Sequence, residues 1–121
     1  MSTRGRRIAI IGHLNRPQVR REAVRIQALL AKRGALVRLE RELAGAVGQS
    51  GDSIAVLSRW CQIMISLGGD GTVLTAGRAL AGRKGVLLAV NMGGLGFLAA
   101  AEGREVDHAV EAALGGKWKV A

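Results

Sequence analysis

The stretch Ser66–Thr72 constrains the fold of this chain most strongly, because a glycine-rich turn there joins two segments of different character. The apolar run 63–65 before it predicts a buried strand, and residues 73–82 after it predict a helix. Three glycines within residues 68–71 let the backbone turn sharply and come close to a ligand. A helix that starts just beyond such a turn offers free N–H groups, which suit a phosphate. The stretch therefore predicts a strand, a tight turn and a helix around an anionic ligand.

Asp70 is the only carboxylate in this turn, and its residue type allows two interpretations. Aspartate is a favoured helix N-cap, so Asp70 could simply cap the helix that follows. A carboxylate also repels a bare phosphate, which points to a different task beside a bound nucleotide. It could hold a metal ion bound to the phosphates, or accept a proton from a hydroxyl under attack. The two interpretations do not exclude each other, and both stay open at this point.

Short apolar runs alternate with helical patterns along the whole chain. Strands are expected at residues 7–12, 35–39, 62–67 and 86–90, and helices at 17–33, 53–60, 73–82 and 104–114. Residues 43–53, rich in Gly, Ala and Ser, are expected to form a loop or a weak helix. Strands that alternate with helices predict an α/β domain with an open parallel sheet of about four strands and helices on both faces.

The first predicted helix has a clear apolar face. Pro17 suits its first turn and Gly34 its end. The apolar face consists of Val19, Ala23, Ile26 and Leu30, at spacings of four, three and four. His13 precedes this helix at the carboxyl end of the first strand, which is the edge where open α/β sheets bind ligands. A lone His in a loop is also commonly incidental, so both interpretations of His13 stay open.

The charge of the chain is strongly basic and uneven. Residues 1–41 hold eleven Lys or Arg against Glu22 and Glu40, which accounts for the whole net charge of +9. A basic surface indicates an anionic partner. Nucleic acid is disfavoured as that partner, because no aromatic residues are interleaved for stacking and no nucleic-acid-binding motif is present. A solvated basic face and the attraction of polyanionic nucleotides are the remaining interpretations.

Composition also limits the cellular setting. The single Cys61 excludes an internal disulfide, lacks Cys or His neighbours at metal-binding spacing, and is expected to be buried. No apolar run reaches the roughly 18 residues of a membrane span. The apolar run after the basic start is shorter than the roughly 7–15 residues of a signal peptide. A cytoplasmic protein of one domain, without a membrane segment and without a protein-built metal site, is therefore expected.

Two motifs carry a family resemblance. Gly68-Gly69-Asp70-Gly71-Thr72 resembles the GGDGT signature of a kinase superfamily that includes NAD kinases, diacylglycerol and sphingosine kinases, and 6-phosphofructokinases. Asn91–Leu98, after another apolar strand, resembles the N-x-G-x-L-G-F-L motif of NAD kinases. The two motifs have the order and the separation that NAD kinases show. The resemblance extends from about Arg7 to Val120.

The resemblance implies a reaction and a site. NAD kinases transfer a phosphoryl group from ATP, or from polyphosphate in some members, to the 2′-hydroxyl on the adenosine side of NAD, with Mg²⁺ or a similar ion. It implies that Asp70 is the general base, with Phe97 beside the adenine or, alternatively, in the core. The nucleotide-binding residues it implies are Gly69, Asp70, Gly71, Thr72, Asn91, Gly93 and Phe97. Thr75 departs from the pattern, because many members have a basic residue there.

Length is a further and more serious departure from the family, in addition to Thr75 and to the missing proline that is common before the second motif. NAD kinases are more than twice as long, and a β-rich second domain holds the rest of NAD and forms much of the oligomer interface. The resemblance therefore implies a nucleotide-binding domain over residues 1–116 and the start of the second domain at 117–121. It also implies a homo-oligomer in the full-length form and little kinase activity for the 121-residue chain alone. The alternatives are another GGDGT kinase, such as a lipid kinase, and a non-catalytic nucleotide-binding module.

Overall fold

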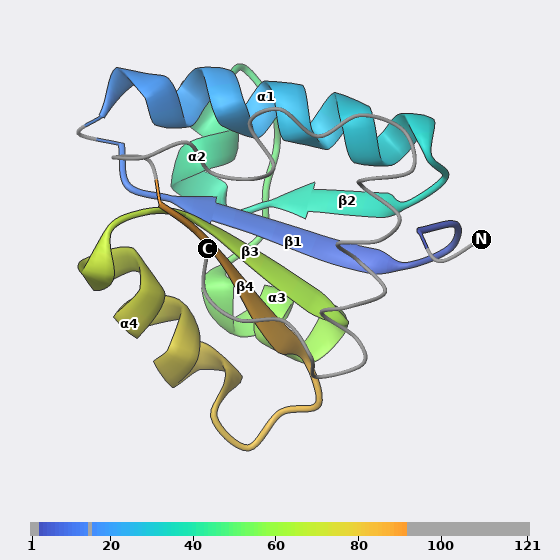
Figure 1. Ribbon diagram of the computed structural model, residues 1–121, viewed down its shortest axis with the longest axis vertical. Coiled ribbons are helices and arrows are strands. Elements are labelled where there is room, and N and C mark those ends of the chain that lie inside the picture. Colours follow the sequence, from blue (N-terminus) through green and yellow to red (C-terminus); the bar gives the residue numbers. More distant parts are fainter. Residues whose placement is uncertain (1–2, 15, 92–121) are drawn as a thin grey trace.

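The computed structural model of the protein describes residues 3–14 and 16–91 (Figure 1). Its elements are β1 (Arg7–Gly12), α1 (Pro17–Lys32), β2 (Leu36–Leu39), α2 (Arg41–Ala46), α3 (Ile54–Trp60), β3 (Ile63–Gly68), α4 (Asp70–Leu80) and β4 (Val86–Asn91). The helix expected at 104–114 and the stretch 117–121 lie outside the described residues. Within the described ranges, none of the helices has the length and apolar character that crossing a lipid bilayer requires.

The four strands form one parallel sheet in the order β2-β1-β3-β4. Ile8 of β1 lies opposite Val37 of β2 on one side and Ile63 of β3 on the other. Gly68 at the end of β3 lies opposite Asn91 at the end of β4. β3 is central and buried along its whole length, as expected of a parallel strand covered on both faces. The sheet confirms the predicted α/β class.

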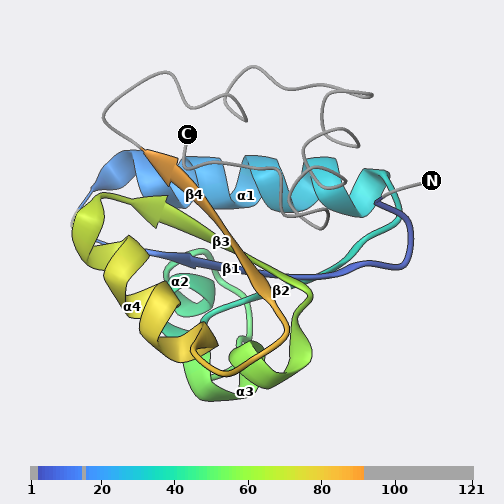
Figure 2. The same ribbon diagram turned by 60° about the horizontal axis from the view of Figure 1, so that its bottom comes forward.

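Helices cover both faces of the sheet, as predicted (Figure 2). α1 packs on one face, and its buried residues are the four predicted from the sequence, Val19, Ala23, Ile26 and Leu30. α3 and α4 pack on the other face, where they meet strand side chains of the opposite parity, Ala9, Ile11 and Met64. A fully buried Val, Leu or Ile contributes about 1.5–3 kcal/mol relative to an exposed one. Successive side chains of the central strands point to opposite faces of the sheet, so each strand stabilises the packing of α1 on one face and of α3 and α4 on the other.

Two helices differ from the sequence prediction at their starts. α4 begins at Asp70 rather than at residue 73. Residues 41–46 form the helix α2, where a loop or weak helix from residue 43 was expected. The carboxylate of Glu40 explains the start of α2, because it accepts hydrogen bonds from the backbone N–H groups of Glu42 (2.9 Å) and Leu43 (3.2 Å). Glutamate is not among the preferred N-cap residues, so the sequence pattern does not predict this helix start.

Candidate functional site

The glycine-rich turn lies at the carboxyl edge of the sheet, at the point where the strand order reverses. From β1 the chain passes through α1 to β2 on one side, and then returns to β3 on the other side of β1. The backbone N–H of His13, directly after β1, donates a hydrogen bond to the carbonyl of Leu67 at 3.2 Å. α1 lies over one face here and α4 over the other (Figure 2). Open α/β sheets bind ligands in the crevice that this divergence creates.

Gly68 shapes the turn, because a larger residue does not fit there. Its φ is 152°, a backbone conformation that L side chains rarely adopt. A Cβ on Gly68 would lie 2.6 Å from Thr72 Oγ1 and 3.3 Å from Thr72 Cβ. The bare Cα therefore lets the first turn of α4 close directly onto the end of β3. Gly68 is a structural requirement of the turn.

Gly69 and Gly71 differ from Gly68, because the fold does not require glycine at either position. Gly69 has φ −113° and ψ −157°, and Gly71 in the first turn of α4 has no positive φ. A Cβ on either would meet no described atom within 4 Å beyond its own chain neighbours and helix backbone. By helix geometry, the N–H groups of Asp70 and Gly71 have no intrahelical acceptor, whereas the N–H of Thr72 donates to the carbonyl of Gly69 at 3.1 Å. Bare backbone with unpaired donors thus faces open space beside the turn.

Asp70 is the first residue of α4, and its side chain is exposed. Gly69 is the N-cap residue, and no side chain caps this helix. The interpretation of Asp70 as the N-cap is therefore wrong, although a negative charge in the first turn still stabilises a helix by about 0.3–1 kcal/mol. Within residues 3–14 and 16–91, no hydrogen bond or ion pair engages the Asp70 carboxylate. It is accessible to a ligand.

A cavity of about 260 Å³ opens beside the turn. Its lining comes from the end of β1, the starts of α2 and α3 and the first turns of α4: Ile11, Gly12, His13, Glu40, Glu42, Ile54, Gly71, Thr72 and Thr75. The Glu40 carboxylate is engaged as the cap of α2, whereas Glu42 is exposed. Bare backbone, hydroxyls, an imidazole and carboxylates can orient a polar ligand through hydrogen bonds.

Two buried hydroxyls near the turn have no hydrogen-bond partner among the described residues, Ser66 Oγ and Thr72 Oγ1. Ser66 is 1% exposed and Thr72 is 6% exposed. Thr75, in contrast, donates from Oγ1 to the carbonyl of Gly71 at 3.0 Å. An unsatisfied buried hydroxyl costs about 1–3 kcal/mol, and such groups are few in folded proteins. Thr72 also lines the cavity, so a ligand that reaches the turn can supply the missing partner.

The structure brings part of the predicted site together. Gly69, Asp70, Gly71 and Thr72 all lie in the first turn of α4 and the residue before it. Asn91 ends β4 opposite Gly68, so the second motif begins directly beside the first. The predicted residues Gly93 and Phe97 lie outside the described part of the chain.

Sequence reasoning did not find the acidic wall of the cavity. Glu40 follows β2 and Glu42 lies in the first turn of α2. The only available signal was position, because residues after parallel strands meet at one edge of the sheet. His13, weighed as a candidate, does line the cavity. Among the residues that the structure describes, no group of three or more His, Cys, Asp or Glu side chains could hold a metal ion.

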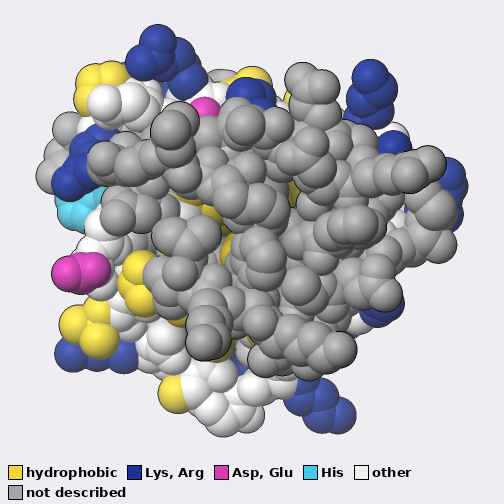
Figure 3. Space-filling view, in the orientation of Figure 1, with side chains coloured by type: hydrophobic (Ala, Val, Ile, Leu, Met, Phe, Trp, Pro, Cys, Tyr) yellow, Lys and Arg dark blue, Asp and Glu magenta, His cyan; other side chains and the backbone are white. Residues whose placement is uncertain are grey.

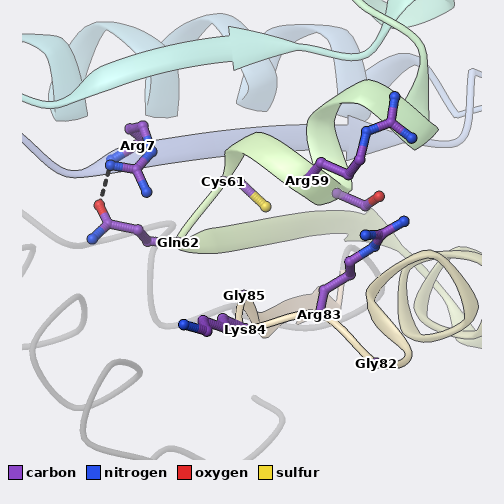
Figure 4. A pocket seen from close by; sticks show the side chains of 9 residues that line it. Arg7, Arg59, Cys61, Gln62, Gly82, Arg83, Lys84 and Gly85 are labelled. Carbon is purple, nitrogen blue, oxygen red and sulfur yellow. Dashed lines mark hydrogen bonds between the residues drawn. The ribbon is translucent and has the colours of Figure 1, made fainter.

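A larger cavity, of about 530 Å³, lies at the opposite, amino edge of the sheet (Figure 4). Its charged lining residues are Arg7, Arg59, Arg83 and Lys84, none of which the sequence singled out. In Figure 3, Lys and Arg side chains are visible at several places along the edge of the face. A second group of arginines, Arg20, Arg21 and Arg25, lies together on α1 beside Val24 and Val47.

Comparison with known proteins agrees with the motifs. The sequence matches the profile of the ATP-NAD kinase N-terminal domain over residues 8–118. The NAD kinase of Geobacter metallireducens is 34% identical over 115 residues, which cover 95% of this chain and 41% of that protein. The NAD kinase of Saccharophagus degradans is 33% identical over 114 residues, which cover 92% and 39%. The chain thus spans about two fifths of the length of these relatives.

Proposed function

The chain belongs to the NAD kinase family, through its N-terminal domain, and on that premise we propose that the carboxyl edge of its sheet binds the nucleotides of an NAD kinase reaction. In that reaction ATP phosphorylates the 2′-hydroxyl of the adenosine ribose of NAD and gives NADP. The observation that carries this proposal is the open space at Gly69 and Gly71, where the fold itself has no need of glycine. A phosphate can approach the N–H groups at the start of α4 there.

Asp70 is the general base in this proposal. A ribose hydroxyl is a poor nucleophile, so its attack on the phosphoryl group gains from a positioned proton acceptor. The hydroxyl oxygen forms the new bond to phosphorus, its proton passes to the carboxylate, and ADP leaves. The rest of phosphoryl transfer needs mainly alignment and neutralisation of charge. The exposed carboxylate at the first position of α4 is accessible for that role.

The other site residues act by binding. The backbone N–H groups of Asp70 and Gly71 are donors for phosphate oxygens, and the Thr72 hydroxyl is a further polar group of the turn. Asn91, Gly93 and Phe97 complete the nucleotide site in this proposal, with Phe97 beside the adenine. The support for these three is the match to the second motif and the backbone of Asn91 opposite Gly68.

In this scheme a divalent ion such as Mg²⁺ would be held mainly by the phosphates of ATP. Mg²⁺ usually keeps several waters and takes one or two carboxylates together with substrate phosphates. Asp70 is the carboxylate in the turn, and the described residues offer no larger acidic cluster, so this chain fits a metal held mainly by phosphate. When bound, the ion supplies neutralisation of the phosphate charge.

The remaining features of the whole protein are part of the same proposal. Residues 1–116 form the nucleotide-binding domain, and 117–121 begin a β-rich second domain. The protein is cytoplasmic, forms a homo-oligomer in its full-length form, and uses ATP or polyphosphate as donor. The support is family membership, together with a match that spans about two fifths of the relatives' length.

Replacing Gly71 with Ala tests the proposed close approach. The new methyl group would occupy the space of the phosphate, so the dissociation constants of ATP·Mg²⁺ and NAD should rise about tenfold or more. The free energy of unfolding should stay unchanged or rise by up to about 1 kcal/mol, because Ala favours a helix over Gly. Amide NMR titrations give the affinities and locate the binding at Gly69–Thr72.

Gly77→Ala is the matched control, because Gly77 lies in the same helix and also has open space around it. It should keep the wild-type affinities. Equal affinities for Gly71→Ala and the wild type would contradict a ligand at this backbone.

A further inference from the structure

The cavity at the amino edge of the sheet is formed by three separate segments (Figure 4). Arg7 begins β1, Arg59 lies in the last turn of α3, and Arg83 and Lys84 belong to the turn before β4. In Figure 4, Arg7 and Lys84 lie on one side of the thiol of Cys61, and Arg59 and Arg83 on the other. No carboxylate lines the cavity among the described residues.

Arg7 is held in place by its neighbours. Its Nε donates to the carbonyl of Trp60 at 2.7 Å, and its backbone N–H donates to Oε1 of Gln62 at 2.9 Å. The bond from Nε orients the guanidinium and leaves its terminal NH₂ groups for other partners, whereas the backbone bond fixes the position of Arg7 at the start of β1. A fixed guanidinium loses little conformational entropy when it binds a phosphate in bidentate fashion.

Helix termini account for only part of this charge. Arg7 and Arg59 lie at the carboxyl end of α3, where cations are favourable. Arg83 and Lys84 are exposed, and no ion pair engages either of them within the part of the chain that the structure describes. Gly85 keeps their turn close to Cys61, since a Cβ there would lie 3.0 Å from the Cys61 carbonyl oxygen. Burial raises the pKa of the Cys61 thiol, so the floor of the cavity stays neutral beside an anion.

The size and charge of the cavity select the class of ligand. A single phosphate carries about 1.5–2 negative charges at neutral pH, which matches only half of four cations. A volume of about 530 Å³, with cations on two sides, suits a longer anion. We propose that this cavity binds an oligophosphate, a chain of two or more linked phosphates, either free or as the tail of a nucleotide.

The proposed site is distinct from the glycine-rich turn. Cys61 and Gln62 precede β3, whereas Gly69 follows it. The six residues of β3 rise about 3.3 Å each, which separates the two sites by about 20 Å. One triphosphate cannot occupy both sites. The oligophosphate site therefore goes beyond the proposed reaction and does not depend on it.

Calorimetric titration of the chain with inorganic tripolyphosphate tests the proposal. Arg83→Gln/Lys84→Gln should weaken binding about tenfold or more, because two charge-assisted contacts are lost. Arg20→Gln/Arg21→Gln removes the same charge from exposed positions on α1 and should leave the affinity within about threefold. Amide NMR should show shifts at Arg83–Gly85 that Arg83→Gln/Lys84→Gln abolishes, whereas any shifts at Gly69–Thr72 should persist in that double variant. ATP that binds there as tightly as tripolyphosphate, or more tightly, supports the site and tells whether a nucleoside is also recognised.

Four results would overturn the proposal. They are no detectable binding of tripolyphosphate, equal weakening by the two double variants, shifts confined to Gly69–Thr72, and orthophosphate binding as tight as tripolyphosphate. The third result separates this site from the nucleotide site, and the fourth separates an oligophosphate site from a site for a single phosphate. If no anion binds at Arg83–Gly85, this proposal fails, but the proposed nucleotide site does not, because that site is tested separately by the effect of Gly71→Ala on nucleotide affinity.

Discussion

Replacing Asp70 with Asn is expected to lower kcat for NAD phosphorylation by about 10²–10⁴-fold, the range that a general base contributes. Asn keeps the shape of the side chain but cannot accept the proton of the attacking hydroxyl. KM should change little, because phosphate binding is assigned to backbone groups of the turn. Folding should persist, since Asp70 is exposed and no bond to another described residue is lost. The assay is steady-state NADP formation by the longest natural form of the protein.

Asp52→Asn is the matched control for this variant. Asp52 makes a half-exposed ion pair with Arg38 at 3.9 Å, an interaction worth at most about 1 kcal/mol, and it does not line the cavity beside the turn. It should retain wild-type kcat. A kcat for Asp70→Asn within about threefold of the wild type would remove Asp70 from the role of general base.

Replacing Gly68 with Ala is expected to lower the free energy of unfolding by about 2–4 kcal/mol, a large share of the stability of a small domain. Two costs add here. The φ of 152° is strained for any L side chain, and the new Cβ would lie 2.6 Å from Thr72 Oγ1. Rotation of Thr72 does not remove the contact, because its Cβ would still lie at 3.3 Å. Chemical denaturation followed by circular dichroism measures the change.

Gly69→Ala is the control for Gly68→Ala, because the neighbouring glycine has an ordinary φ of −113° and open space around it. Its unfolding free energy should stay within about 0.5–1 kcal/mol of the wild type. Equal losses of unfolding free energy in Gly68→Ala and Gly69→Ala would mean that the turn responds in the same way to alanine at either position. The contact between Gly68 and Thr72 would then not determine the stability of the turn.

Much of the fold is predictable from the sequence because the signals are local. The signals for α1 all lie within that helix or directly after it. The structure confirms the first turn at Pro17, the buried face of Val19, Ala23, Ile26 and Leu30, and the end of the helix before Gly34. The apolar runs likewise predict the four strands, and the alternation of elements predicts their parallel arrangement. The structure confirms the sheet and the two helical layers.

The predicted start of α4, at residue 73, was wrong because the true start at Asp70 depends on the neighbouring strand β4. Gly and Asp are both acceptable N-cap residues, so the local sequence does not choose between Gly69 and Asp70. β3 continues to Gly68 because Gly68 pairs with Asn91 of β4. Only Gly69 then remains between strand and helix, and Asp70 becomes the first helical residue.

The two cavities could not be predicted either, because the residues that line each of them lie far apart in the sequence. The acidic wall of Glu40 and Glu42 meets the turn only because β2 and β3 flank β1. The basic cavity gathers residues 7, 59, 83 and 84, which form no local pattern. Both arise from the strand order, and strand order is a property of the folded sheet. The glycine-rich turn was predictable because all of its groups lie within seven consecutive residues, 66–72.

The most direct test of the central claim is the identity of the molecule that becomes phosphorylated. The longest natural form of the protein is incubated with ATP and Mg²⁺ and with NAD, diacylglycerol or a sphingoid base. We expect phosphorylation of NAD alone, with the product identified as NADP by mass spectrometry and by its use in an NADP-specific dehydrogenase. Phosphorylation of either lipid without formation of NADP would contradict an NAD kinase and assign the turn to another kinase with the same signature.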